Sequence, residues 1–107
     1  MPNNYKNAKL DLTTTGATVL YTCPAATTAL VKSILASEDS GNADTLTVTI
    51  TDADAAVFSL FKVKAVGANT TVELLTEPLV VQENEILTLT AATANRLHVV
   101  ASLLEIN

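Results

Sequence analysis

The stretch TLTVTIT, residues Thr45–Thr51, decides the fold class because its apolar and polar residues alternate without a break. Side chains of a β-strand point alternately to its two faces, so a period of two predicts one strand with two distinct faces. Leu46, Val48 and Ile50 form the apolar face, and threonines form the other. Threonine suits a pleated sheet, and the threonine face is compatible either with water or with contact to another protein.

Similar short segments, separated by turn signals, follow along the whole chain. Many short β-rich segments at regular spacing predict a sandwich or a barrel. Two segments, Leu30–Ala36 and Val57–Val66, also show helical spacing, and each fits either a helix or a strand buried on both faces. We therefore predict one all-β domain over residues 1–107, an antiparallel β-sandwich of jelly-roll or immunoglobulin-like type with seven to nine short strands. The other expected strands are Lys6–Leu12, Ala17–Cys23, Thr45–Asp52, Thr70–Thr76, one starting at Pro78, Ile86–Ala91 and Leu97 to the end.

Composition and charge narrow the classes of partner. Hydrophobic residues make up 49% of the 107 residues, while charged residues make up only 16%, so much of the surface is neutral or is covered in an assembly. The formal net charge is −5, and the six Lys and Arg residues are scattered. A nucleic-acid binder normally carries a basic patch, and anionic membranes attract basic segments. We therefore expect neither nucleic acid nor a membrane as partner.

The residues offer little material for an enzyme or a cofactor site. Cys23 is the only cysteine and His98 the only histidine, so no internal disulfide is expected. A Cys23/His98 pair is disfavoured because an activated thiol needs an electropositive, partly open setting. The polar start of the chain lacks an apolar signal segment, so we expect assembly in a reducing cytoplasm. We predict no enzymatic activity, no catalytic residues and no cofactor.

An acidic loop after the Leu30–Ala36 segment is the best candidate for a metal site. Its carboxylates and amide are oxygen ligands of the kind Ca²⁺ prefers. However, the order EDSGNAD lacks the spacing of an EF-hand and its bidentate glutamate, so a solvated loop without metal is the default interpretation. The loop residues concerned are Glu38, Asp39, Asn42 and Asp44, to which Asp52 and Asp54 add if the fold brings them near.

The last predicted strand, from Leu97 onward, carries apolar residues on both faces. One face can cover the sandwich core, while the other is either internal to a central strand or covered by another subunit. We predict self-association through Val100, Leu104 and Ile106, together with Tyr5 on an extended N-terminal arm over residues 1–5. Closed symmetric oligomers are the usual outcome, and a trimer is the first expectation.

Two long stretches resemble small structural proteins of tailed bacteriophages. The first is LYTCPAATTALVKSILASEDSGNADTLTVTITD (20–52), where a Tyr-Thr-x-Pro-Ala element precedes a strand, an Asn/Asp-rich turn and a Thr-rich strand. The second is LVVQENEILTLTAATANRLHVVASLLEI (79–106), which resembles the closing half. It departs at Glu83-Asn84-Glu85, where such proteins often carry glycine.

The resemblance implies a non-enzymatic protein present in many copies on a virion and assembled in the host cytoplasm. It favours a capsid decoration or cement protein that contacts itself and the major capsid protein. The alternatives are a neck, collar, tail or fibre component, or a module that binds host glycans through loops 38–44 and 67–71.

Overall fold

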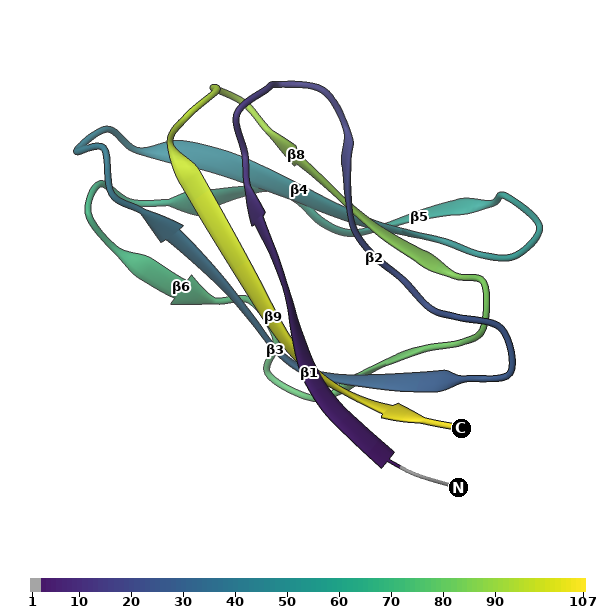
Figure 1. Cartoon of the computed structure of the whole chain (residues 1–107). Helices are drawn as coiled ribbons and strands as arrows, with labels where there is room; N and C mark the ends of the chain where they lie inside the picture. Colours follow the sequence, from purple (N-terminus) through teal and green to yellow (C-terminus); the bar gives the residue numbers. More distant parts are fainter. Residues whose placement is uncertain (1–2) are drawn as a thin grey trace.

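The computed structural model describes residues 3–107 and shows two β-sheets packed face to face (Figure 1). The all-β sandwich predicted from the sequence is confirmed, and both helix-or-strand segments are strands, β3 and β5. No helix among the described residues is long and apolar enough to span a membrane. The strands are β1 (Asn3–Asp11), β2 (Thr18–Thr22), β3 (Thr28–Glu38), β4 (Asp44–Thr51), β5 (Val57–Val66), β6 (Thr71–Glu73), β7 (Leu79–Val81), β8 (Ile86–Ala91) and β9 (Leu97–Ile106).

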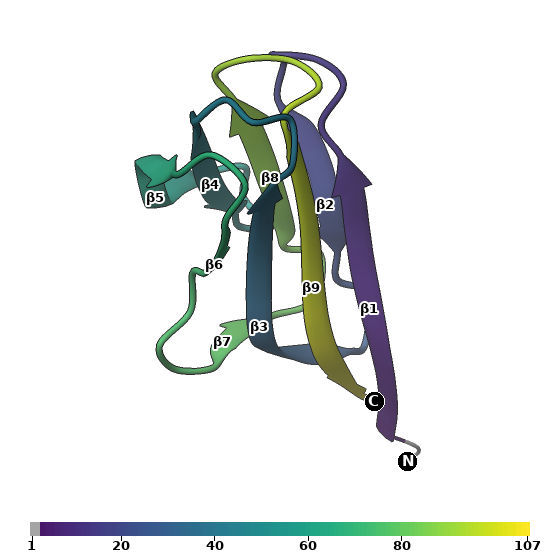
Figure 2. The ribbon, with the colours of Figure 1, turned by 90° about the vertical axis from the view of Figure 1, so that its left-hand side faces the viewer.

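The strand order identifies the sandwich as a jelly roll. One sheet has the order β1-β9-β3, with β6 and β7 both paired to the far edge of β3, and the other has the order β2-β8-β4-β5. Consecutive strands β1 and β2 lie in different sheets, and the last strand lies between the first and the third (Figure 2). If β6 and β7 are taken as two pieces of one interrupted strand, this is the eight-stranded jelly-roll arrangement. The topology thus decides between the two predicted types of sandwich.

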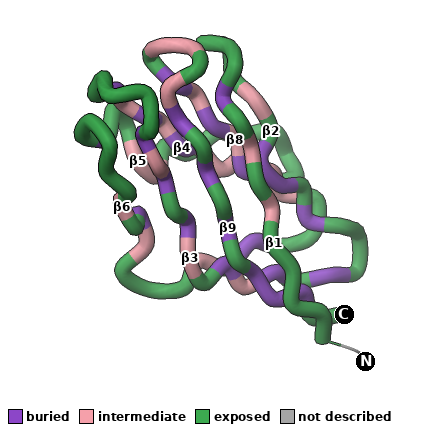
Figure 3. Tube along the Cα trace, turned by 60° about the vertical axis from the view of Figure 1, so that its left-hand side comes forward, coloured by how far each residue is buried: buried purple, intermediate pink, exposed green. Residues whose placement is uncertain are grey.

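The core lies between the inner faces of the two sheets, and buried residues alternate with exposed ones along the strands (Figure 3). On β4, Leu46 and Val48 are completely buried, as the alternation of the opening stretch predicted. On β9, the predicted inward face is buried, and its residues are Leu97, Val99, Ala101 and Leu103; Leu104 and Glu105 are buried as well.

The threonine face of β4 forms a ladder with β8. Thr47 lies opposite Thr90, and Thr49 lies opposite Thr88. All four are half-buried, because each is flanked by side chains of neighbouring strands on the outer face of the sheet. Cross-strand threonine pairs stabilise a sheet, so the ladder has a structural role within the single chain.

The N-terminal segment continues the first sheet rather than leaving it. Asn3, Asn4 and Tyr5 belong to β1 and pair with residues at the end of β9. Residues 1–2, which were also part of the expected arm, lie outside the described residues.

Candidate interaction surfaces

The outer face of the first sheet carries a group of exposed apolar side chains around β9, which we call the β9 surface: Tyr5, Leu35, Val100 and Ile106; Val80 on β7 is a further exposed apolar residue of this sheet, at its other edge. The exposed fractions of Tyr5, Val100 and Ile106 are 72%, 37% and 43%. Val100 lies between Lys9 on β1 and Leu35 on β3. The Lys32 ammonium lies 5.4 Å from the centre of the Tyr5 ring, at cation–π distance.

Leu104 is placed differently from the other predicted contact residues. It is only 9% exposed, because its register neighbours are Tyr5 on β1 and Leu30 on β3. Its side chain is covered by its own chain and offers little area to a partner. The outer face of β9 therefore exposes less apolar area than the alternation of the sequence suggested.

A second group of exposed apolar side chains lies on β5, at the edge of the other sheet. This β5 surface consists of Val57, Phe58 and Val63, which are 63%, 55% and 59% exposed. The register of β5 with β4 shifts twice, between Leu46 and Val48 and again between Val48 and Thr49. Figure 2 shows that β5 and β1 lie on opposite sides of the molecule.

The sequence analysis did not predict that β5 exposes apolar side chains. The helical spacing in 57–66 arises because each bulge inserts an extra residue and breaks the alternation of the strand. Val63 has φ +54°, a left-handed conformation that is unusual for a β-branched residue, and its N–H donates to Thr47 Oγ1 at 3.0 Å. No local signal in the sequence marks such a bulge.

The acidic loop is organised by Glu38, which is 2% exposed at the end of β3. Its carboxylate accepts hydrogen bonds from the backbone N–H groups of Ser40 (2.7 Å), Gly41 (3.1 Å) and Asn69 (3.0 Å), and from the Ser40 hydroxyl. Burial by itself would raise the pKa of Glu38, but these donors outweigh it and lower the pKa to about 2. The carboxylate thereby joins loops 38–44 and 67–71.

The other carboxylates of the candidate metal site are directed elsewhere. Asp44 accepts the Thr93 N–H at 3.1 Å, and Asp39 lies 3.5 Å from His98 Nδ1. Among residues 3–107, no group of three or more His, Cys, Asp or Glu side chains is arranged to hold a metal ion. Asp52 Oδ1 accepts the backbone N–H groups of residues 54 and 56, which closes the β4–β5 hairpin.

The structure does not bring Cys23 and His98 together. Cys23 follows β2, is completely buried, and donates its thiol hydrogen to the Thr27 carbonyl at 3.3 Å. Burial raises the pKa of this thiol, which keeps it protonated and unreactive. His98 lies at the start of β9, where its Nε2 is 3.2 Å from Asp11 Oδ1.

A buried polar link joins the two sheets near the chain termini. The Tyr21 hydroxyl on β2 donates to Glu105 Oε2 on β9 at 2.5 Å, and Lys6 Nζ lies 3.5 Å from the same oxygen. Burial and then the bond to Glu105 raise the pKa of Tyr21, so the phenol remains a donor. Sequence reasoning missed this pair because its members are 84 residues apart.

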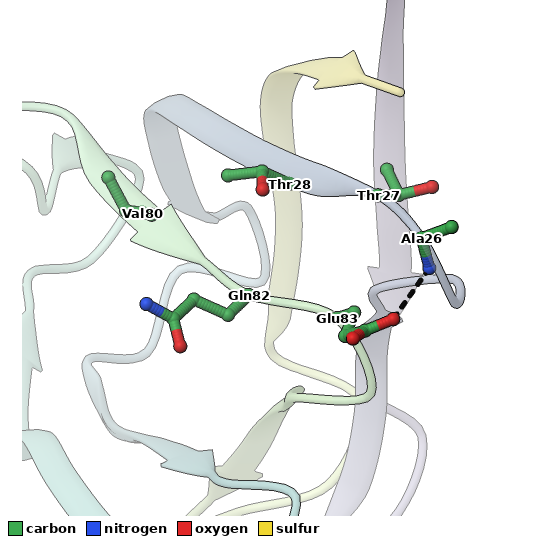
Figure 4. A pocket seen from close by; sticks show the side chains of 6 residues that line it. All are labelled: Ala26, Thr27, Thr28, Val80, Gln82 and Glu83. Atoms are coloured by element: carbon green, nitrogen blue, oxygen red, sulfur yellow. Dashed lines mark hydrogen bonds between the residues drawn. The ribbon is translucent and has the colours of Figure 1, made fainter.

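An open groove of about 410 Å³ lies beside the loop that leads into β3 (Figure 4). Glu83 is the one titratable residue among its lining side chains, and its Oε2 accepts the Ala26 N–H at 2.6 Å. This bond holds Ala26 at φ +57°. The Glu83 carboxylate is thus already used by the backbone, and the other polar lining groups are the hydroxyls of Thr27 and Thr28 and the amide of Gln82. The lining residues of the groove are Ala26, Thr27, Thr28, Val80, Gln82 and Glu83.

Comparison with known proteins gives a match of fold alone. No family model and no curated protein matches this chain. A solved chain from Bacillus endospore appendages, which form a novel family of disulfide-linked pili, is similar with a TM-score of 0.60. The match covers 99% of this chain and 87% of that chain at 9% sequence identity. The chain thus shares the β-sandwich of a pilus-forming protein over nearly its whole length.

The expectation of a tailed-phage virion protein is wrong, because a solved structure that is similar over almost the whole chain comes from an endospore appendage. The roles expected from it are wrong as well: capsid decoration, a neck, collar, tail or fibre component, and host-glycan binding. The major capsid protein is likewise not supported as a partner, and the virion is not supported as the location. The physical reason is that the phage resemblance consisted of strand and turn spacing. Different jelly rolls with short turns reproduce such spacing without common function.

Proposed function

We propose that this chain is a non-enzymatic structural subunit that assembles with further copies of itself into a fibre on a cell or spore surface. The full-length likeness of fold to a pilus-forming chain supports this proposal. The carboxylates and the phenol whose pKa values are shifted all serve structural hydrogen bonds, as at Glu38 and Tyr21.

The observation that carries the proposal is the presence of two exposed apolar surfaces on opposite sides of one subunit. The β9 surface lies on the first sheet beside β1, and the β5 surface lies at the far edge of the second sheet. Exposed apolar patches on a small soluble domain indicate contact with another protein. Two contact sites on opposite sides allow each subunit to bind two neighbours, and such contacts extend into an open fibre where the rotation between neighbours does not close a ring.

The contacts between subunits are non-covalent in this proposal. A continuous chain of disulfides needs at least two cysteines in each subunit, and these 107 residues contain one. That one, Cys23, is completely buried in the core. This separates the chain from the matched appendages, whose pili are disulfide-linked.

Assembly of the purified chain tests the proposal. Light scattering at rising protein concentration, with electron microscopy of the same samples, is expected to show growth into fibres. Val100→Asp on the β9 surface and Phe58→Ser on the β5 surface are each expected to stop fibre growth while the circular dichroism spectrum stays unchanged.

Val19→Asp is the matched control, because Val19 is 50% exposed on β2 and belongs to neither surface. It is expected to assemble as the wild type does. A wild-type chain that stays monomeric at every concentration contradicts the proposal, and so do fibres that form normally from both surface variants.

A further inference from the structure

We infer that β1 is the site of a two-fold contact, in which the free edge of β1 pairs antiparallel with β1 of a second copy around Asn7. The inference rests on the proposed self-association and names the geometry of one of its two contacts. The pairing brings the Tyr5 end of the β9 surface to the contact, and the rest of that surface continues onto the outer face of the second copy.

The other sheet edges are blocked against such pairing. β2 has five residues with a register shift between Val19 and Tyr21, and Pro24 follows it. β5 has two register shifts and the left-handed residue Val63. β6 and β7 are three-residue pieces separated by a segment that contains Pro78. Bulges, short strands and prolines are the usual devices that protect an edge.

β1 has none of these devices. It pairs with β9 over nine residues without a register shift, and its range contains neither proline nor glycine. Among the described strands, only β9 pairs with β1, so its second edge is free. Its two lysines, which can also protect an edge, are held locally: Lys6 by Glu105 at 3.5 Å and Lys9 by Asn7 Oδ1 at 3.1 Å.

The backbone of β1 shows which groups face the free edge. The Leu12 N–H donates to the Leu97 carbonyl at 3.0 Å, in continuation of the β1–β9 register. Hydrogen-bonding groups of successive residues point to opposite sides of a strand, so the even-numbered residues of β1 bond to β9. The odd-numbered residues direct their N–H and C=O groups outward. They are Asn3, Tyr5, Asn7, Lys9 and Asp11.

A two-fold axis through Asn7 pairs all of these outward groups. Such an axis is normal to the sheet, so the outer face of one subunit continues as the outer face of the other. Asn7 then lies opposite Asn7 of the second copy, Tyr5 opposite Lys9, and Asn3 opposite Asp11. No like charges face each other, and each Tyr5 ring receives a second cation next to its own Lys32.

The edge is ready for pairing without rearrangement of the subunit. The side chains of residues 3–7 are all exposed, and those of Ala8 and Leu10 on the inner side are only half-buried. A second copy that arrives at this edge therefore displaces water and no element of the fold. The β5 surface on the opposite side supplies the second contact. Along the fibre, β1 contacts would then alternate with β5 contacts.

Site-directed disulfides test the contact and its register in the full chain. In a hydrogen-bonded antiparallel pair the two Cα atoms are about 5.5 Å apart, which suits a disulfide. Asn7→Cys is expected to form a covalent dimer in a glutathione redox buffer. Lys9→Cys is the matched control, because two copies of position 9 lie four residues apart along the paired strands and are out of reach.

Equal cross-linking of both variants, or none in Asn7→Cys, overturns the inference. The β5 variant Phe58→Ser supplies a second readout, since it is expected to stop at a dimer instead of a monomer. Fibres of wild type together with monomers of Phe58→Ser leave the proposed function standing and contradict the β1 pairing. Absence of any wild-type assembly contradicts the proposed function instead.

A charge exchange tests the same register without cysteine chemistry. Tyr5→Lys places two lysines opposite each other across the contact, and the dimer of the Phe58→Ser background is expected to weaken by at least tenfold. Adding Lys9→Glu restores opposite charges at that pair and is expected to recover the dimer. Failure of Tyr5→Lys to weaken the dimer, or of Lys9→Glu to restore it, contradicts the pairing around Asn7.

Discussion

At the scale of single residues, the Glu38 carboxylate couples the acidity of one group to the order of two loops. Its lowered pKa means that folding favours the ionised form, because protonation would remove acceptors from three backbone N–H groups. The stabilisation is complete above the ordinary pKa of 4.5 and is lost as pH falls toward the folded-state pKa of about 2. Glu38 therefore makes the fold sensitive to acid.

We predict that Glu38→Gln lowers the midpoint of urea unfolding at neutral pH. The glutamine amide turns its own N–H group toward backbone N–H groups that now donate to the carboxylate, so some of these hydrogen bonds are lost. The difference between wild type and variant is expected to shrink as pH falls from 4.5 toward 2. Glu77→Gln, at an exposed glutamate, serves as control and should leave the midpoint unchanged. A wild-type advantage that stays constant over this pH range would show that the carboxylate charge is irrelevant.

The Tyr21–Glu105 bond gives a second prediction at this scale. Tyr21→Phe removes the donor and leaves a carboxylate that is 7% exposed with Lys6 as its remaining partner. A buried acceptor left without its donor costs about 1–3 kcal/mol, so the free energy of unfolding should fall by that amount. Urea denaturation measures the change. Tyr5→Phe, on an exposed tyrosine, should change it by less than about 0.5 kcal/mol.

At the scale of elements, the strands show what a sequence period can and cannot predict. The alternation in β4 and β9 predicted their inner faces correctly, because neither strand carries a bulge of its own on those faces. In β3, the register with β9 shifts between Val31 and Ser33, so Val31 and Ile34 are both completely buried at a spacing of three. That spacing imitates a helix.

The bulge in β3 is held by a residue that no local pattern reveals. Glu73 on β6 accepts the Ile34 N–H at 2.8 Å and the hydroxyl hydrogen of Ser33. Burial by itself would raise the pKa of Glu73, but these donors outweigh burial, and the pKa is lowered. The jelly-roll order and such links depend on pairings far apart in the chain, so the sequence predicted the strands but neither the β5 surface nor the polar links.

The strained residue of β5 leads to a prediction about the whole strand. A left-handed conformation costs an L-residue about 1–2 kcal/mol, and asparagine tolerates it far better than valine. Val63→Asn is therefore expected to raise the free energy of unfolding by about 1 kcal/mol. It also removes an apolar side chain from the β5 surface, so fibre growth should weaken although the subunit is more stable.

Val57→Asn is the matched comparison, because Val57 lies on the same surface without a left-handed backbone. It should weaken assembly similarly and give no gain in stability. Thermal denaturation and light scattering on both variants separate the two effects. Equal stability changes in the two variants would show that Val63 is not strained.

At the scale of the whole molecule, the proposed fibre joins this sandwich in a different way from the matched appendages. The matched appendages are disulfide-linked, whereas in these 107 residues the one thiol is buried and protonated. Sheet pairing and apolar contact must then supply the association free energy by themselves. Such contacts respond to dilution and denaturant and are indifferent to redox conditions.

We therefore predict that a thiol reductant leaves the fibres unchanged in length and number, as seen by electron microscopy and light scattering. Cys23→Ala should assemble equally well, with a small loss of subunit stability from the space left in the core. Val100→Asp should dissolve the fibres under oxidising and reducing conditions alike, because its effect is on apolar contact. Fibres that fall apart in reductant but persist in Val100→Asp would mean that Cys23 leaves the core to bridge subunits, and that the surfaces on β9 and β5 are not what holds them together.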